Sequence, residues 1–458
     1  MFSSLSEREY IMVRLFLISA AVLACMPAAA HARESDIVGS DVTARIEVDF
    51  TGMKDGVTTL FSDRVEGWVL IRNSGTSSHG VLPGEDGGLG VALYEVTDTG
   101  VTRKEWTMAA PVIEAGGSVG SAFTLGKEGL EDGRTYMVVA ECMCGQTHSI
   151  SDTLAFEVCG GSAVWMKDGT AATVGLEDGT LVIPEGTVAA RIEGSENLCE
   201  ASPNPNCIFY VTGIPQESLA GRNVVAGGRT ERLDLTDGYP FHAPARFTAG
   251  RAVFEYRTLT QGWDAIALPF DCMYVVAPDI NGDWSLHVDV RELTGVSGNS
   301  LLSKDVKDGP MTCDRPYIVR LGEPGMRLQF LSEDVGIGMS ASPVAALGDV
   351  AFMGTFTGNE EPGIYTMSDD GKAFTQHGKA GPFRGYLTSR DELPDVLYID
   401  SENPDAISSP IADKACEGKG VTVLTTDGRV VYEGKDMPQL GRGLYIVRMG
   451  GKTVKMAR

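Results

Sequence analysis

The sequence predicts an all-β fold in which several β-sandwich-like domains follow one another, ending in a small C-terminal β-sandwich. The 458 residues include 56 Gly and 21 Pro, which separate short apolar runs along the whole chain, as is typical of strands joined by turns. Every stretch longer than about 25 residues contains a Gly or Pro, so no helical domain has room to form. Hydrophobic residues make up 43% of the chain, and its length suggests about three domains with cores of their own.

The charge balance excludes one class of partner. The chain carries 62 acidic residues against 38 Lys and Arg, which gives a formal net charge of −24. Proteins that bind nucleic acid neutralise backbone phosphates with clustered basic residues. We therefore expect no nucleic-acid partner.

Residues 1–32 are predicted to form a cleaved signal peptide. The run 15–24 is apolar but too short to span a bilayer. It is followed by Ala30-His31-Ala32, the small-x-small pattern that signal peptidase reads. The mature chain would then begin at Arg33.

Two alternatives concern the same segment. Met12 is a candidate initiator, because Met12-Val13-Arg14 makes a tighter basic start than the residues before it. Cys25 is a candidate for lipid attachment, although Leu23 fits that motif poorly and we favour simple cleavage. No second apolar run of about 18 residues follows, so no transmembrane segment is expected after signal removal.

Residues 33–160 are predicted to form an immunoglobulin- or fibronectin-like β-sandwich. Strand candidates without helical periodicity recur every ten to thirty residues or so, which is typical of a two-sheet domain. They lie at 65–71, 90–96, 121–125 and 136–141.

Residues 161–245 have a different strand pattern, in which single short strands are separated by Asn, Gly and Pro. The candidates are 179–184, 207–211, 223–225 and 232–235. Such strands suit a short solenoid, in which each rung buries its apolar face against its neighbours. Because no strict period is present, an irregular β-layer is the alternative.

Residues 246–405 are predicted to form a further β-rich domain. Motifs of aromatic, proline, glycine and asparagine residues occur in a fixed order at 204–206, 238–244, 247–249, 262–270, 314–319, 352–356 and 382–387. In these motifs the chain resembles a recurring module of Bacteroidota surface proteins. The sequence departs from the module at Asp264, where Asn is usual, and at Gly385, where Ala is usual. No catalytic residue accompanies the resemblance, because the repeated positions are packing and turn residues.

Nine cysteines are present, and removal of the signal peptide would leave eight, an even number compatible with disulfides in an oxidising compartment. If the strands that flank Cys272 and Cys313 pair in the module, these two are a candidate disulfide, worth about 4 kcal/mol in the chain-entropy model. Zinc is disfavoured, because Cys142-Met143-Cys144 has one residue between the cysteines where zinc ligands need two to four or so.

Residues 406–458 are predicted to form a small domain of four strands. Thr426-Asp427-Gly428-Arg429 has the signature of a hairpin turn between apolar runs, and two more runs follow at 444–448 and 452–455. From residue 411 onward this pattern resembles the C-terminal sorting domain of type IX secretion cargo. The alternative is that these are the last strands of the preceding domain.

The resemblance to a sorting domain implies a partner and a location. The partner is the type IX secretion machinery, with attachment to a surface glycolipid or contact with a glycan. The location is secreted or cell-surface, on the outer face of the outer membrane. The residues that match the sorting signal are Asp427, Gly428, Arg429, Gly443, Tyr445, Val447, Gly451, Lys452 and Lys455.

Sequence motifs provide little evidence for catalysis or for metal binding. The glycines at 116–120 spell a nucleophile elbow but precede a strand, where the elbow requires a helix. Gly451-Lys452-Thr453 lacks the earlier glycine and the helix of a P-loop. Asp279, Asn281 and Asp283 are a weak calcium candidate that a hairpin at Asn281-Gly282 explains equally well. We expect no cofactor and no other metal site.

Two hypotheses about function follow. The first is a non-enzymatic surface protein, adhesin-like, scaffolding or glycan-contacting, and the absence of catalytic motifs favours it. The alternative is a secreted β-sandwich hydrolase acting on glycans or peptides, since paired carboxylates leave no local signature. Exposed aromatics would support glycan contact, and Trp106, Trp165 and Trp284 stand in polar surroundings, whereas Trp68 and Trp263 lie in apolar strands and are expected in cores.

Overall fold

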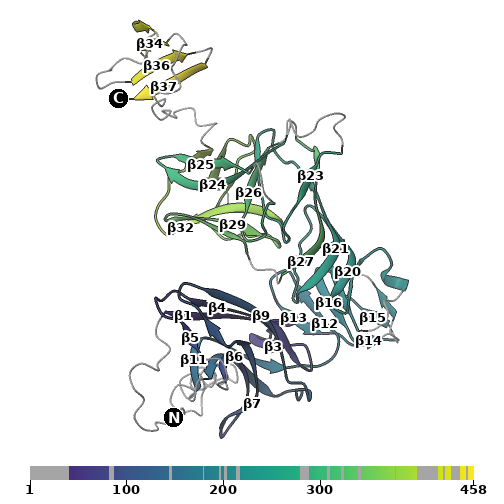
Figure 1. The fold of residues 1–458 in the computed structure, drawn as a ribbon. Helices are drawn as coiled ribbons and strands as arrows, with labels where there is room; N and C mark the ends of the chain where they lie inside the picture. The colour runs from purple at the N-terminus through teal and green to yellow at the C-terminus, as the bar shows by residue number, and fades with distance from the viewer. Residues whose placement is uncertain are drawn as a thin grey trace, which may run out of the picture.

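The computed structural model of the protein describes residues 41–81, 87–143, 147–178, 180–194, 198–200, 204–212, 217–278, 288–306, 310–320, 324–338, 342–376, 378–399, 421–425, 429–434, 444–449 and 452–457. These residues form strands and one 3-10 turn, η1 (Glu217–Leu219), arranged in several sheets (Figure 1). The all-β, multi-domain prediction is therefore confirmed. In this part of the chain, no helix has the length and apolar character needed to cross a bilayer.

The first domain is a sandwich of two sheets around one core. Alternate residues of its central strand are buried, from Val65 to Asn73, because successive side chains of a strand point to opposite faces. Val69 and Ile71 from one sheet meet Val138 and Phe156 from the other. The three-stranded sheet has the order β1 (Val42–Val48), β4 (Val65–Asn73), β9 (Ser118–Leu125).

The facing sheet of this domain has six strands. Its order is β2 (Thr51–Lys54), β3 (Val57–Leu60), β11 (Thr147–Val158), β10 (Thr135–Met143), β6 (Gly88–Thr97), β7 (Gly100–Ala110). A short pair, β5 (His79–Gly80) with β8 (Val112–Ile113), lies beside it.

A nine-stranded sheet follows. Its order is β13 (Ala171–Thr173), β12 (Ala163–Met166), β16 (Thr187–Ile192), β18 (Ile208–Val211), β19 (Asn223–Ala226), β20 (Arg229–Thr236), β21 (Phe247–Arg257), β27 (Arg327–Ile337), β23 (Tyr274–Val276). The sheet runs across the boundary expected between residues 245 and 246, because β20 pairs in parallel with β21.

Two turns of this region are solenoid-like. The chain alternates between the nine-stranded sheet and a small sheet formed by β14 (Leu176–Glu177), β15 (Thr180–Val182) and β17 (Leu198–Glu200). β15 pairs in parallel with β17, and β16 with β18. Leu181 and Ile183 pack against Ile192 and Phe209 between the two layers. Each turn thus buries its apolar face against the next.

Buried asparagines hold the loops around these turns. Asn206 is fully buried, and its amide exchanges two hydrogen bonds with the backbone of Thr236, at 2.7 and 2.9 Å. Asn223 forms the same pair of bonds with Asp234, at 2.9 and 3.0 Å. A buried amide needs partners for both its donor and its acceptor. The asparagine motif at 204–206 is therefore an architectural element.

A closed, barrel-like sheet forms the next part of the molecule. Eight strands close into a ring because β22 pairs with both β26 and β32, and β29 (Val350–Thr355) and β28 (Val344–Leu347) extend it. The ring order is β22 (Trp263–Ile266), β26 (Tyr317–Arg320), β24 (Asp289–Ser297), β25 (Ser300–Asp305), β33 (Val396–Ile399), β31 (Ala373–Gln376), β30 (Tyr365–Met367), β32 (Arg384–Ser389).

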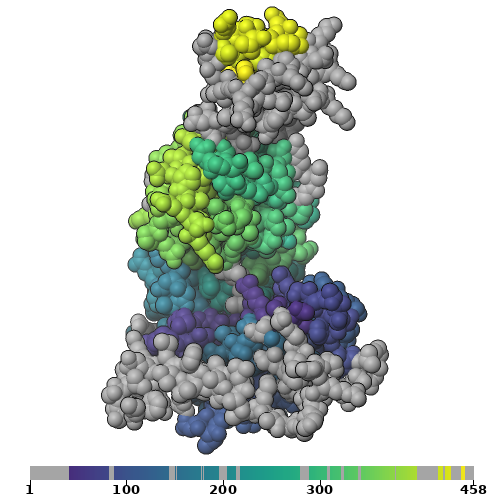
Figure 2. Space-filling model, turned by 90° about the vertical axis from the view of Figure 1, so that its left-hand side faces the viewer, coloured from purple at the N-terminus to yellow at the C-terminus, as the bar shows by residue number. Residues whose placement is uncertain are grey.

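The last strands form one antiparallel sheet of their own. Its order is β35 (Val430–Gly434), β34 (Val421–Thr425), β36 (Leu444–Met449), β37 (Lys452–Ala457). A core of Val421, Val423 and Val447 holds it together. Figures 1 and 2 place this sheet at one end of the molecule and the first domain at the other.

The predicted Cys272–Cys313 disulfide is not formed, although the two segments do meet. Cys272 exchanges backbone hydrogen bonds with Met311, at 2.7 and 3.0 Å, which makes Met311, and not Cys313, its cross-strand neighbour. The Cys272 thiol instead donates to the carbonyl of Tyr274 at 3.1 Å. Cys159 and Cys313, like Cys272, carry free thiols.

Candidate functional site

Several sequence-predicted site residues lie outside the described residues. These are the cleavage-site residues Ala30, Ala32 and Arg33, the calcium candidates Asp279, Asn281 and Asp283, and Asp427, Gly428, Gly443 and Gly451 of the sorting signal.

The remaining sorting-signal residues belong to the C-terminal sheet. Val447 is buried in its core, and Tyr445 packs against that core. Lys452 and Lys455 lie on β37, opposite Met449 and Ile446. Arg429 closes the turn after β34, where its carbonyl accepts the N–H of Thr425 at 2.8 Å. The structure thus brings these residues together in one small sheet.

Two tryptophan assignments from the sequence are wrong. Trp68 was expected in a core but is 37% exposed, whereas Trp165 is fully buried between Phe50 and Phe61. The strand alternation carried the signal for Trp68, because it shares the phase of Glu66 and Arg72, not that of the buried Val65 and Val69. Trp263 is buried as expected. Trp106 is half-buried, and Trp284 lies outside the described residues.

A cleft of about 410 Å³ opens where the first domain meets the nine-stranded sheet. This volume lies within the range of small-molecule sites. Charged, hydroxyl, aromatic and glycine residues line it: Asp49, Phe50, Ser62, Asp63, Arg64, Glu66, Arg191, Tyr210, Val211, Thr212, Val225, Gly227, Gly228, Ala245 and Arg246.

Phe50 fixes the geometry of this cleft. Its backbone has φ 60°, a left-handed conformation that non-glycine residues rarely adopt. Its N–H donates to the carbonyl of Pro244 at 2.7 Å, and its carbonyl accepts from Phe61 at 2.9 Å. The ring meets Tyr210 edge-on, with 5.2 Å between centroids. The first domain therefore contributes an aromatic anchor to the core of the second, and the cleft has a packed floor.

Asp49 and Arg246 are the perturbed charges of the cleft. Burial raises the pKa of Asp49 to about 7, against the opposing effect of the Arg246 backbone N–H, which lies 3.4 Å from Oδ1. Burial also lowers the pKa of Arg246 to about 10. Nη2 of Arg246 pairs with Glu47. Nη1 is buried without a hydrogen-bond partner and lies 4.0 Å from Oδ1 of Asp49.

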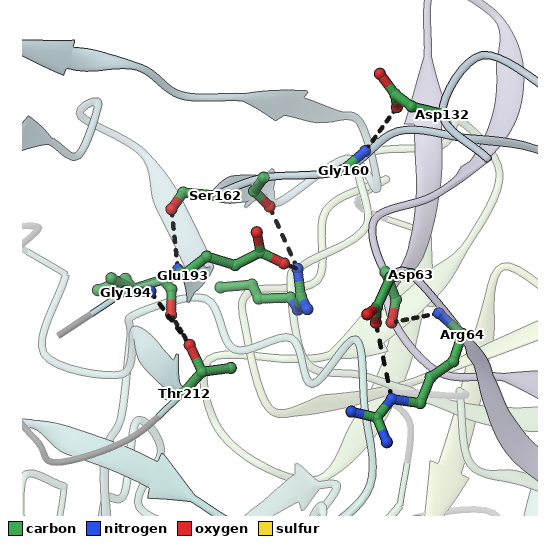
Figure 3. A network of polar contacts seen from close by, with 12 residues as sticks. Asp63, Arg64, Asp132, Gly160, Ser162, Glu193, Gly194 and Thr212 are labelled. Atoms are coloured by element: carbon green, nitrogen blue, oxygen red, sulfur yellow. Dashed lines mark hydrogen bonds and ion pairs between the residues drawn. The ribbon is translucent and has the colours of Figure 1, made fainter. Parts of the chain in front are cut away.

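Polar contacts hold the walls of the cleft (Figure 3). The backbone N–H of Glu193 donates to the hydroxyl of Ser162 at 3.0 Å, and that of Gly194 donates to Thr212 at 3.3 Å. On the side of the first domain, Asp63 and Arg64 are neighbours with a 3.7 Å ion pair. The first two contacts join the ends of the neighbouring strands β12, β16 and β18 and anchor this wall, whereas the Asp63–Arg64 pair lies within the loop between β3 and β4.

A second cavity, of about 350 Å³, adjoins Asp264 and Arg384 in the closed sheet. Asp264 is 3% exposed and accepts the N–H of Leu259 at 2.6 Å, and burial raises its pKa. Arg384 makes two hydrogen bonds to Asp237, at 2.8 and 2.9 Å. Because its charges are paired within the protein, this cluster has the properties of a structural element.

Both departures from the surface-protein module line this second cavity, since Asp264 and Gly385 are among its walls. A Cβ at Gly385 would lie 2.6 Å from the ring of Phe352. The glycine is therefore required by the close approach of that ring.

Metal ligation has no support in the described part of the chain, where no group of three or more His, Cys, Asp or Glu is arranged to hold an ion. His242 is buried, which lowers its pKa to about 4. The residues that line the cleft offer hydrogen bonding and charge, supplied by carboxylates, guanidinium groups and hydroxyls.

No protein-family model matches the chain, and no curated protein matches it. Among solved structures, a Bacillus subtilis protein described as a lipoprotein is similar at 14% identity and a TM-score of 0.16, over 28% of this chain and 39% of that one. A Paenibacillus cycloisomaltooligosaccharide glucanotransferase is similar at 8% identity and a TM-score of 0.18, over 91% and 99%.

A biofilm-associated protein domain is similar at 10% identity and a TM-score of 0.14, over 93% of this chain and 67% of that one. The chain spans 39% of the length of the lipoprotein. Similarities with TM-scores this low carry no inference about this chain.

Proposed function

We propose that the protein is a non-enzymatic, adhesin-like surface protein that the type IX secretion machinery exports through the C-terminal sheet β34–β37. The observation that carries this proposal is the independence of that sheet. Its strands pair with one another, and its core is formed by Val421, Val423 and Val447 with two tyrosines from the same sheet. A sorting signal must be read, and in many cargoes removed, without unfolding the rest of the protein.

The remainder of the molecule suits display outside the cell. Strong negative charge keeps a protein soluble and monomeric, and this chain carries −24. The first domain and the nine-stranded sheet share a core in which Phe61 packs with Trp165, so they form one stiff unit. The proposed location is the outer face of the outer membrane, with attachment to a surface glycolipid.

Export is tested with two matched substitutions on the same strand. Val447→Asn places an amide in the buried core of the sheet, whereas Arg448→Asn changes the adjacent, exposed residue. Protease shaving of intact cells and fractionation then measure surface exposure. We expect the Val447 variant to accumulate in the periplasm and the Arg448 variant to reach the surface.

Stability controls make the outcome unambiguous. Thermal unfolding of the purified variants should be unchanged for the larger domains, whose cores contain no residue of β34–β37. Surface exposure of a variant lacking residues 421–458 at the wild-type level would refute the sorting role.

A further inference from the structure

The outer face of the three-stranded sheet leads directly into the cleft described above. Glu47 lies opposite Trp68 in the β1–β4 register. One step nearer the cleft, the N–H of Asp49 donates to the carbonyl of Glu66 at 2.8 Å. Because residues two apart share a face of a strand, Glu47, Trp68, Asp49 and Glu66 form one continuous row from the open face into the cleft.

Trp68 provides a flat platform at the start of this row. Ala122 lies opposite it on β9, and a Cβ at neighbouring Gly120 would lie 2.6 Å from the indole. The indole therefore rests over residues with almost no side chain and remains 37% exposed. A large aromatic ring left open beside small residues is a typical stacking surface.

Arg246 connects the platform to the cleft. Its guanidinium lies 5.7 Å from the centre of the Trp68 ring, and it also lines the cleft. Glu47 is shared between this guanidinium and that of Arg45, which lies 3.0 Å away. Nη1 of Arg246 is buried beside Asp49 without a hydrogen-bond partner, but the Arg246 side chain as a whole is 27% exposed, so its open part faces a ligand where platform and cleft meet.

The charge of the cleft restricts the ligand. Its charged lining residues are three acids, Asp49, Asp63 and Glu66, and three arginines, Arg64, Arg191 and Arg246. Balanced charge disfavours a polyanion and a polycation alike, and the net charge of −24 repels polyanions further. A partner protein would need a wider apolar patch than a single exposed indole. A neutral molecule with many hydroxyls and an apolar ring face fits best.

We propose that Trp68, Arg246 and the adjoining cleft form a binding site for a neutral oligosaccharide. One sugar ring stacks its C–H face on the indole, and the next units place hydroxyls against the carboxylates and guanidinium groups of the cleft. The ligand class rests on the proposed function, since a displayed protein meets extracellular glycans.

The test uses the purified full-length protein and calorimetry with four neutral probes: cellohexaose, maltohexaose, mannohexaose and xylohexaose. Heparin and polygalacturonate serve as anionic probes. We expect at least one neutral probe to bind and the anionic probes not to bind. Tryptophan emission should shift on binding, because Trp68 is solvent-exposed.

Three variants locate the site. Trp68→Ala removes the platform, and Ala122→Arg covers it while leaving the indole in place. Because the two variants block the same platform by different changes, a folding defect in one of them does not decide the result. Each should weaken binding about tenfold or more. Tyr274→Ala, which removes a still more exposed aromatic on β23, should change affinity by less than about twofold.

Failure of all four neutral probes to bind, binding of anionic probes only, or full affinity in both Trp68→Ala and Ala122→Arg would each overturn the proposal. These outcomes leave the sorting role untouched, because surface exposure is measured in a separate experiment on intact cells. A protein retained in the periplasm that still binds a neutral probe would in turn separate the two proposals.

Discussion

Two arginine–aspartate pairs in this protein differ in how closely the two side chains approach each other. Arg384 of the closed sheet and Asp237, which follows β20 of the nine-stranded sheet, have side chains 12% and 10% exposed and are joined by hydrogen bonds of 2.8 and 2.9 Å. Arg246 and Asp49 lie in the cleft, 4.0 Å apart, with side chains 27% and 14% exposed. Each guanidinium also lies near an aromatic ring, Tyr256 at 4.8 Å in one case and Trp68 at 5.7 Å in the other.

The comparison shows that the same two residue types can stabilise the fold, as Arg384 and Asp237 do, or border a cleft that is open to a ligand, as Arg246 and Asp49 do. Burial alone would lower the pKa of Arg384, but Tyr256 and Asp237 outweigh it and raise that pKa. In the cleft burial dominates: it lowers the pKa of Arg246, and it raises the pKa of Asp49 in spite of the opposing backbone N–H of Arg246. Each arginine has one buried nitrogen without a hydrogen-bond partner, Nε of Arg384 and Nη1 of Arg246, so the difference is that Arg384 bonds its aspartate directly whereas Arg246 stands 4.0 Å from its own.

The largest effect on stability is expected from breaking the Arg384–Asp237 pair. Arg384→Ala leaves Asp237 as a buried charge without its partner, which should lower the free energy of unfolding by about 3–5 kcal/mol. Urea unfolding followed by tryptophan fluorescence measures the loss. The matched control is Arg232→Ala, which removes an exposed pair with Asp234, at 2.6 Å, and should cost less than about 1 kcal/mol. Equal losses in the two variants would contradict the architectural role.

The sequence predicted the all-β class because turn residues and short apolar runs act locally. It also placed Trp263 in a core, since an apolar strand is enough to indicate burial. It could not predict the cleft, because Asp49 and Arg246 are separated by almost two hundred positions and meet only when two domains dock. Glu47, Glu66 and Trp68 are similarly uninformative until the register of the strands is known.

A smaller effect is expected from restoring the residue usual in the resembled module. Gly385→Ala adds a Cβ 2.6 Å from the ring of Phe352, and such overpacking costs about 1–3 kcal/mol. Gly381→Ala is the control on the same segment, where a Cβ would meet its nearest neighbour, Arg384, at 3.9 Å. Differential scanning calorimetry should show a lower unfolding temperature for the first variant only. An unchanged temperature for Gly385→Ala would mean that Phe352 can move aside.

In the cleft, the pH dependence of stability should depend on Asp49. Its pKa is about 7 in the folded protein and near the ordinary aspartate value of 3.8 when unfolded. The folded state therefore holds the proton more tightly, and this contribution to stability is complete below pH 3.8 and lost as the pH rises through about 7. Relative to Asp49→Asn, the wild-type protein should lose about 2 kcal/mol between pH 5 and 7. Parallel stability profiles for the two proteins would contradict the assignment.

The smallest effect on stability is expected from removing Arg246, the arginine of the Arg246–Asp49 pair. Arg246→Met keeps an unbranched chain against Trp68, Glu47 retains Arg45 at 3.0 Å, and Asp49 can take up a proton near neutral pH instead of remaining as a buried charge. The cost at pH 6 should therefore be below about 1 kcal/mol, several times less than for Arg384→Ala. Above pH 8 the cost should grow, because Asp49 is then forced to ionise without its neighbouring guanidinium. Urea unfolding of both arginine variants at pH 6 and pH 8.5 tests this directly. If Arg246→Met costs as much stability at pH 6 as Arg384→Ala, then the Arg246–Asp49 pair stabilises the fold as much as the Arg384–Asp237 pair does.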